Sequence, residues 1–91
     1  MSQPTANNWI SDYDITIALQ KLERAIQRRI QKHGNKPHAS AHETLGIIQE
    51  ELYEVMKCIH ENQDPIITAK ELRDVAVAAI WGMIGLENGD D

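Results

Sequence analysis

The strongest constraint on this 91-residue chain is a helical repeat of apolar residues in successive segments. In the first segment, apolar residues recur at steps of three and four: Ile15, Leu19, Leu22, Ile26 and Ile30. A second segment repeats the pattern: Leu45, Ile48, Leu52, Val55 and Ile59. This spacing lines one face of an α-helix, whereas a strand would alternate. No segment shows a convincing strand pattern, so the chain is predicted to be all-α.

Capping signals place the helix ends. The pair Ser11–Asp14 and the capping box Ser40–Glu43 each open a helix. The third helix starts either at Asp64–Pro65 or one turn later, at the capping box Thr68–Glu71. Within a single domain, the predicted helices are 11–34, 40–62 and 65–86, and the predicted flexible tails are 1–10 and 87–91.

The third helix is predicted to be apolar on every side. No residue from Val75 to Ile84 is charged, and a helix that is apolar all round is normally buried all round. Two neighbouring helices of one subunit cannot cover it completely. We therefore predict an antiparallel hairpin with an additional N-terminal helix, associated with further copies in a four-helix-bundle-like homo-oligomer.

Composition argues against several classes of protein. No apolar run approaches the roughly 18 residues of a membrane span, and no signal peptide is recognised at the start, so neither a membrane partner nor export is expected. Fourteen acidic residues against nine Lys and Arg argue against a nucleic-acid partner. The lone Cys58 has no disulfide partner and is expected to be a small buried hydrophobe. A cytoplasmic location is the expectation.

Two carboxylate pairs carry the chemistry. Glu51 with Glu54, and Glu71 with Asp74, are each three residues apart, so each pair shares one helix face. Counted from a turn near Gln63, both pairs reach the same height in an antiparallel hairpin with a rise of about 1.5 Å per residue. Such a cluster is self-repelling unless a cation lies within it. Oxygen ligands favour Mg²⁺, with Mn²⁺ as the alternative.

The acidic and histidine residues also allow alternatives to a Mg²⁺ site. A single acidic pair is usually a solvated surface. A di-iron bundle needs Glu-x-x-His pairs, and neither Glu51 nor Glu71 has a His three residues later. The histidines do not predict a zinc site, because His38 precedes the cap of the helix that carries His42.

The acidic motifs carry a family resemblance. Glu50-Glu51-x-x-Glu54, sixteen further residues and Glu71-x-x-Asp74 resemble the EExxE…ExxD signature of the MazG-like all-α nucleoside triphosphate pyrophosphatase superfamily. The segment from Ala41 to Glu51 is similar to that of small phage- and integron-associated members, and the resemblance covers roughly Ser40 to Leu86, about half of the chain. It implies the all-α pyrophosphatase fold, assembly as a homodimer or tetramer, and a role in cleansing the nucleotide pool.

The resemblance also implies an activity. This is Mg²⁺-dependent hydrolysis of a nucleoside or deoxynucleoside triphosphate between the α and β phosphates, giving a monophosphate and pyrophosphate. Carried over by motif position, the metal ligands are Glu51, Glu54, Glu71 and Asp74. Glu50 either supports a ligand or orients the attacking water.

Further residues are candidates for substrate binding. A basic stripe on the first helix is either a solvated face or a phosphate-binding surface: Lys21, Arg24, Arg28 and Lys32. Lys57 and Lys70 lie close to the acidic motifs in sequence, and Trp81 either stacks on a base or packs in a core between subunits. Because no Lys or Arg follows Arg73, a catalytically degenerate binding protein remains an alternative. A plain helical interaction protein is the other.

Overall fold

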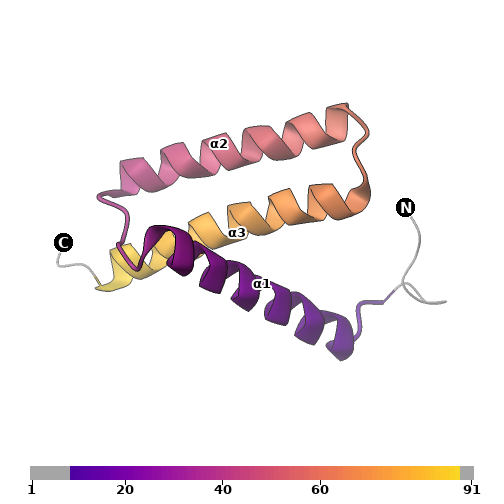
Figure 1. Cartoon of the computed structure of the whole chain (residues 1–91), viewed down its shortest axis with the longest axis horizontal. Helices are drawn as coiled ribbons and strands as arrows, with labels where there is room; N and C mark the ends of the chain where they lie inside the picture. Colours follow the sequence, from indigo (N-terminus) through magenta and orange to yellow (C-terminus); the bar gives the residue numbers. More distant parts are fainter. Residues whose placement is uncertain (1–8, 89–91) are drawn as a thin grey trace.

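Three α-helices make up the fold. The computed structural model describes residues 9–88, and its helices are α1 (Asp12–His33), α2 (Ala41–His60) and α3 (Pro65–Asn88) (Figure 1). Within this described part there is no strand, so the predicted all-α, three-helix class is confirmed. Glu87 and Asn88 are helical, so the tail predicted over 87–91 is wrong for these two residues. Residues 9 and 10 lie before α1 and are not helical, and the other predicted tail residues, 1–8 and 89–91, lie outside the described residues.

The first helix has the predicted cap. The Ser11 hydroxyl accepts a hydrogen bond from the Asp14 backbone N–H at 3.0 Å, and the Asp14 carboxylate accepts one from the Ser11 N–H at 2.9 Å. These two bonds satisfy donors that the first turn leaves free. At the other end Gly34 adopts a positive φ of 78° and donates to the Ile30 carbonyl. Gly34 therefore stops α1 in a conformation that few other residues adopt at low cost.

The cap of α2 differs from the prediction in one bond. The Ser40 hydroxyl accepts from the Glu43 N–H, as expected. The Glu43 carboxylate, however, accepts from the N–H of Ala39 rather than from that of Ser40. The complete capping box predicted for Ser40–Glu43 is therefore wrong in its second half. The Glu43 carboxylate still satisfies a free backbone donor, one residue earlier in the chain.

The turn into α3 settles the choice between two helix starts. Asn62 adopts a positive φ of 53°, and Gln63 donates to the Cys58 carbonyl. The Asp64 carboxylate then accepts from the Ile66 N–H at 2.8 Å, and α3 begins at Pro65. The alternative start at Thr68 is excluded, because Thr68 lies inside the helix.

The helix α3 is the central element. It packs against both α2 and α1, and it forms an antiparallel hairpin with α2, while α1 crosses it at an angle and reaches away from the hairpin at its N-terminal end (Figure 1). The buried cluster between α1 and α3 consists of Ala25, Val77 and Trp81. Between α2 and α3, Gly82 lies so close to Thr44 that a Cβ at this position would collide with the threonine methyl group.

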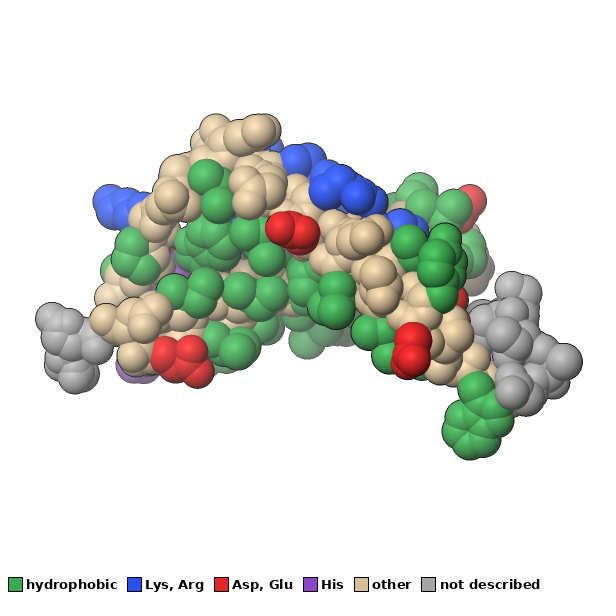
Figure 2. All heavy atoms as spheres, turned by 90° about the horizontal axis from the view of Figure 1, so that it is seen from below, with side chains coloured by type: hydrophobic (Ala, Val, Ile, Leu, Met, Phe, Trp, Pro, Cys, Tyr) green, Lys and Arg blue, Asp and Glu red, His purple; other side chains and the backbone are tan. Residues whose placement is uncertain are grey.

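Many large apolar side chains stay exposed in the single chain. On the hairpin, Leu52 is 47%, Met56 49% and Met83 55% exposed. Figure 2 shows hydrophobic side chains gathered across the middle of one face, with Lys and Arg along its upper edge. Exposed apolar area on this scale is typical of a surface that contacts another protein.

Candidate functional site

Three of the four predicted metal ligands converge between the hairpin helices. Glu51 of α2 and Glu71 and Asp74 of α3 each offer a carboxylate oxygen, and these oxygens all lie within 4.8 Å of one another. All three residues are half-buried. Glu71 and Asp74 are one turn apart on α3. The tight turn at residues 61–64 places Glu51 of α2 level with them. We call these three residues the carboxylate cluster.

The carboxylates of the cluster repel one another. Partial burial raises the pKa of Glu51 above its ordinary value of 4.5, and the negative charges of Asp74 and Glu71 raise it further. Lys70 lies 3.6 Å from the Asp74 carboxylate, one turn before it on α3. Both side chains are more than a third exposed, so this ion pair offsets little of the repulsion. The cluster therefore favours a positive charge at its centre.

The donor set suits a hard divalent cation. All three groups are carboxylates, which are the ligands that Mg²⁺ and Mn²⁺ prefer, whereas zinc sites usually include nitrogen or sulfur ligands. Three carboxylates from two helices can bind such an ion and leave positions for water or phosphate oxygens. The residues present therefore fit the predicted metal.

Glu54 and Glu50 lie outside the carboxylate cluster. Glu54 is exposed and adds to the negative charge around Glu51, but its carboxylate is not among the oxygens within 4.8 Å. Glu50 is also exposed, and it lines with Glu51, Glu54 and Tyr53 a shallow hollow on the α2 surface. The sequence spacing correctly predicted that Glu51 lies level with Glu71 and Asp74. The direction of the Glu54 side chain, in contrast, depends on the packing of α2.

A groove joins the carboxylate cluster to the basic side of α1. The groove has a volume of about 360 Å³, and Glu51 and Asp74 line it. Across from them, α1 contributes Arg28, Arg29 and Lys32. Among residues 9–88, no ion pair within 4.0 Å joins these α1 residues to the cluster. The basic groups of α1 thus share one groove with Glu51 and Asp74 without forming ion pairs with them.

The other basic candidates differ in their relation to the groove. Lys70 lines the groove and pairs with Asp74. The other three, Lys21, Arg24 and Lys57, are exposed and do not line the groove. Arg29 was missed by the sequence analysis. A signal was available, because Arg29 follows Ala25 by one turn and extends the buried edge of the α1 apolar stripe.

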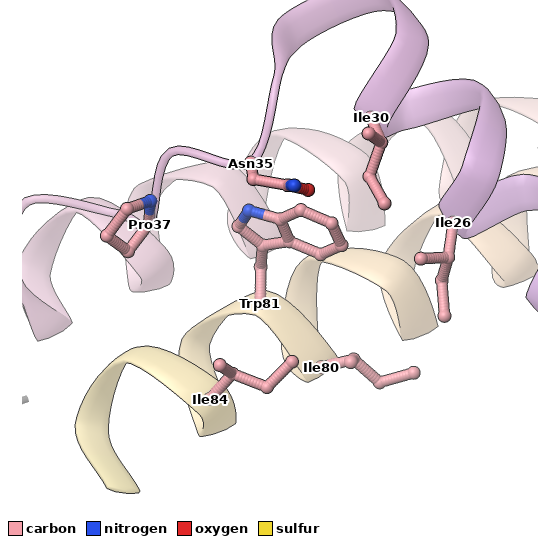
Figure 3. Close-up of a pocket in the computed structure, with 7 residues that line it drawn as sticks. All are labelled: Ile26, Ile30, Asn35, Pro37, Ile80, Trp81 and Ile84. Atoms are coloured by element: carbon pink, nitrogen blue, oxygen red, sulfur yellow. The ribbon is translucent and has the colours of Figure 1, made fainter. Parts of the chain in front are cut away.

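Trp81 lies in the core rather than open to the groove. Its side chain is 7% exposed, and its indole N–H donates to the Lys36 carbonyl at 3.0 Å. The Arg29 guanidinium carbon lies 4.6 Å from the centre of its ring. Trp81 also lines a separate apolar cavity of about 320 Å³ with Ile26 and Ile30 of α1 opposite it (Figure 3). In this arrangement it packs α1 onto α3 within one subunit, and stacking on a base stays a prediction.

The structure also shows the surroundings of Cys58 and His38. Cys58 is buried, which raises the pKa of its thiol, and Glu71 and Glu54 raise it further. Such a thiol is poorly reactive at neutral pH, as expected for a small buried hydrophobe. His38 lies before α2, and its Nδ1 is 2.6 Å from the Thr44 hydroxyl.

Comparisons with protein-family models, curated proteins and solved structures gave no match. Across residues 9–88, no helix combines the length and hydropathy needed to span a membrane.

Proposed function

We propose that this chain is a Mg²⁺-dependent nucleoside triphosphate pyrophosphohydrolase. It would convert a nucleoside or deoxynucleoside triphosphate into the monophosphate and pyrophosphate. One observation carries the proposal: Glu51 and Asp74, which converge with Glu71, line a groove that Arg28 and Lys32 line from α1. Carboxylates for a cation and basic groups for an anion are the two requirements of a metal-assisted phosphoryl site. The likeness of the acidic motifs to the MazG-like signature agrees with this chemistry.

The residues have distinct roles in the proposal. Glu51, Glu71 and Asp74 hold the cation, and Glu54, on the same helix as Glu51, joins them in the presence of substrate. When bound, Mg²⁺ or Mn²⁺ supplies charge neutralisation and a water of lowered pKa. Arg28 and Lys32 attract and orient the phosphates, and Glu50 supports a ligand or orients the attacking water. The proposed role, nucleotide-pool cleansing, belongs in the cytoplasm.

The proposed enzyme is a homo-oligomer. Leu52 and Met56 of α2 and Leu72 and Met83 of α3 are each about half exposed, although they lie on a hairpin that otherwise packs tightly. A second hairpin against this face would complete a four-helix bundle and bury them. Analytical ultracentrifugation is expected to show a dimer or tetramer at micromolar concentration. A monomer under these conditions would contradict this part of the proposal.

The activity is tested by product analysis. A panel of canonical and modified NTPs and dNTPs is incubated with the protein in Mg²⁺, Mn²⁺ or EDTA, and pyrophosphate and monophosphate are measured. The proposal predicts equal amounts of both products, and none in EDTA. Release of inorganic phosphate in place of pyrophosphate would contradict it, because this would indicate cleavage at the γ-phosphate.

The same panel separates the alternatives. No product, with melting still stabilised by Mg²⁺, would indicate a binding protein without turnover. No product and no metal effect would indicate a plain helical interaction protein.

A further inference from the structure

Arg29 differs in its burial from the other basic residues that α1 contributes to the groove. It lines the groove together with Glu51 and Asp74, but it belongs to α1, the helix that packs against α3 away from the hairpin contact. Unlike Arg28 and Lys32, which are exposed, Arg29 is half-buried. Its charge is therefore less screened by solvent than that of its neighbours.

The Arg29 side chain has an unused donor. Its Nε is shielded from solvent and has no hydrogen-bond partner in the described part of the chain. A buried donor without an acceptor is unfavourable, and no carboxylate of residues 9–88 forms an ion pair with Arg29. Nε and one terminal nitrogen form the fork with which arginine binds two oxygens of a phosphate. Because Nε has almost no solvent-accessible surface, an anion in the groove can accept from it only after the side chain turns, whereas Arg29 as a whole already lines the groove.

Trp81 holds this guanidinium in place. The Arg29 guanidinium carbon lies 4.6 Å from the centre of the Trp81 ring, within the range of a cation–π contact. Trp81 is itself fixed by burial and by its hydrogen bond to the Lys36 carbonyl. Ordering Arg29 on a fixed ring before the ligand arrives reduces the entropy lost on binding.

We infer that Arg29 binds a phosphate group of a polyphosphate whose other oxygens reach the cation held by the carboxylate cluster. The inference rests on the proposed function, and it identifies the polyphosphate part of the substrate as the part that bridges α1 and the hairpin. Trp81 acts as a positioning residue through Arg29. A lysine at position 29 keeps the charge but lacks the fork.

The test uses inorganic tripolyphosphate as the probe, because it has no base or sugar. Calorimetric titration of the full chain with tripolyphosphate in Mg²⁺ is compared for the wild type, Arg29→Lys and Arg29→Ala. Arg29→Lys is expected to weaken binding about tenfold, the effect of losing one charge-assisted hydrogen bond. Binding of Mn²⁺ alone, and the melting temperature of Arg29→Lys, should stay as in the wild type. The KM for a nucleoside triphosphate should rise with the dissociation constant.

Lys36→Ala is the matched control. It removes a positive charge from an exposed side chain in the same region, while the backbone carbonyl that binds Trp81 remains. This variant should bind tripolyphosphate as the wild type does. If Arg29→Lys also binds as tightly as the wild type, Arg29 only covers Trp81 and the inference is overturned. Arg29-dependent binding without pyrophosphate release from nucleotides would instead contradict the proposed function and support the inference.

Discussion

The hairpin and α1 differ in how firmly they are built into the molecule. The two helices of the hairpin pack along their length, and Gly82 and Thr44 meet so closely that the glycine has no room for a side chain. By contrast, α1 is anchored mainly through its second half, around Ala25. In its first half Tyr13 is 72% and Leu19 59% exposed.

This difference divides the proposed site into two parts. The carboxylate cluster lies within the hairpin, where helix packing fixes the positions of charges that repel one another. The basic residues lie on the less anchored α1, so substrate phosphates can help to order that side. The comparison predicts that cation binding depends on the hairpin alone, and that polyphosphate binding depends on both parts.

The largest effect is expected from removing a charge in the carboxylate cluster. Asp74→Asn or Glu71→Gln should lower pyrophosphate release by about a hundredfold or more, since changes to groups that only support metal ligands already cost 10–100-fold. Without metal, the stability should change by less than about 0.5 kcal/mol. Both variants relieve repulsion, and in Asp74→Asn this relief offsets the lost pair with Lys70. Steady-state kinetics and urea unfolding measure the two effects.

Glu23→Gln is the control for these variants, because it removes an exposed carboxylate of α1. It should retain wild-type turnover. If Asp74→Asn fails to fold in metal-free buffer, Asp74 has a structural role and the cation-site assignment is contradicted.

A matched pair of glycines tests the rigidity of the hairpin. Gly82→Ala should destabilise the fold by about 1–3 kcal/mol, because the added methyl group collides with Thr44, whose hydroxyl is held by His38. Gly46→Ala should stabilise it by up to about 1 kcal/mol, because nothing lies within 4 Å of the added carbon and alanine favours the helix. Thermal and urea unfolding of both variants measure these changes in stability. Equal effects would mean that the close α2–α3 contact is not formed.

A smaller effect is expected from the titration of Glu51. Its raised pKa means that the folded chain keeps a proton on Glu51 to a higher pH than the unfolded chain does. The contribution of Glu51 to the stability of the metal-free protein therefore falls as the pH rises from about 4.5 through the raised pKa. Glu51→Gln abolishes this fall, so at pH 7 it should be more stable than the wild type by about 0.5 kcal/mol, a typical like-charge repulsion.

The measurement is urea unfolding in EDTA from pH 4 to pH 8. The advantage of Glu51→Gln should disappear at the acidic end, where the wild-type carboxyl is protonated. An advantage that is independent of pH would show that charge repulsion at Glu51 is not its cause.

Much of the hairpin could be predicted from local sequence. The start of α2 follows from a short-range hydrogen bond at Ser40, and the equal height of Glu51 and Glu71 follows from counting residues from the turn. Local spacing does not encode the approach of α1, because this depends on contacts such as that of Trp81 with Lys36, 45 residues away. The spacing from Ala25 puts Arg29 at the edge of the α1 apolar stripe, but only the fold shows that Trp81 lies beneath it.

The central claim is that Glu51, Glu71 and Asp74 form a cation site. The most direct test follows the melting temperature of the wild type and Asp74→Asn during titration with Mg²⁺, without nucleotide. A saturable stabilisation of the wild type is expected, about 2.7 kcal/mol at a hundred times the dissociation constant, and little or none for Asp74→Asn. The same response in both proteins, or none in the wild type, would contradict it.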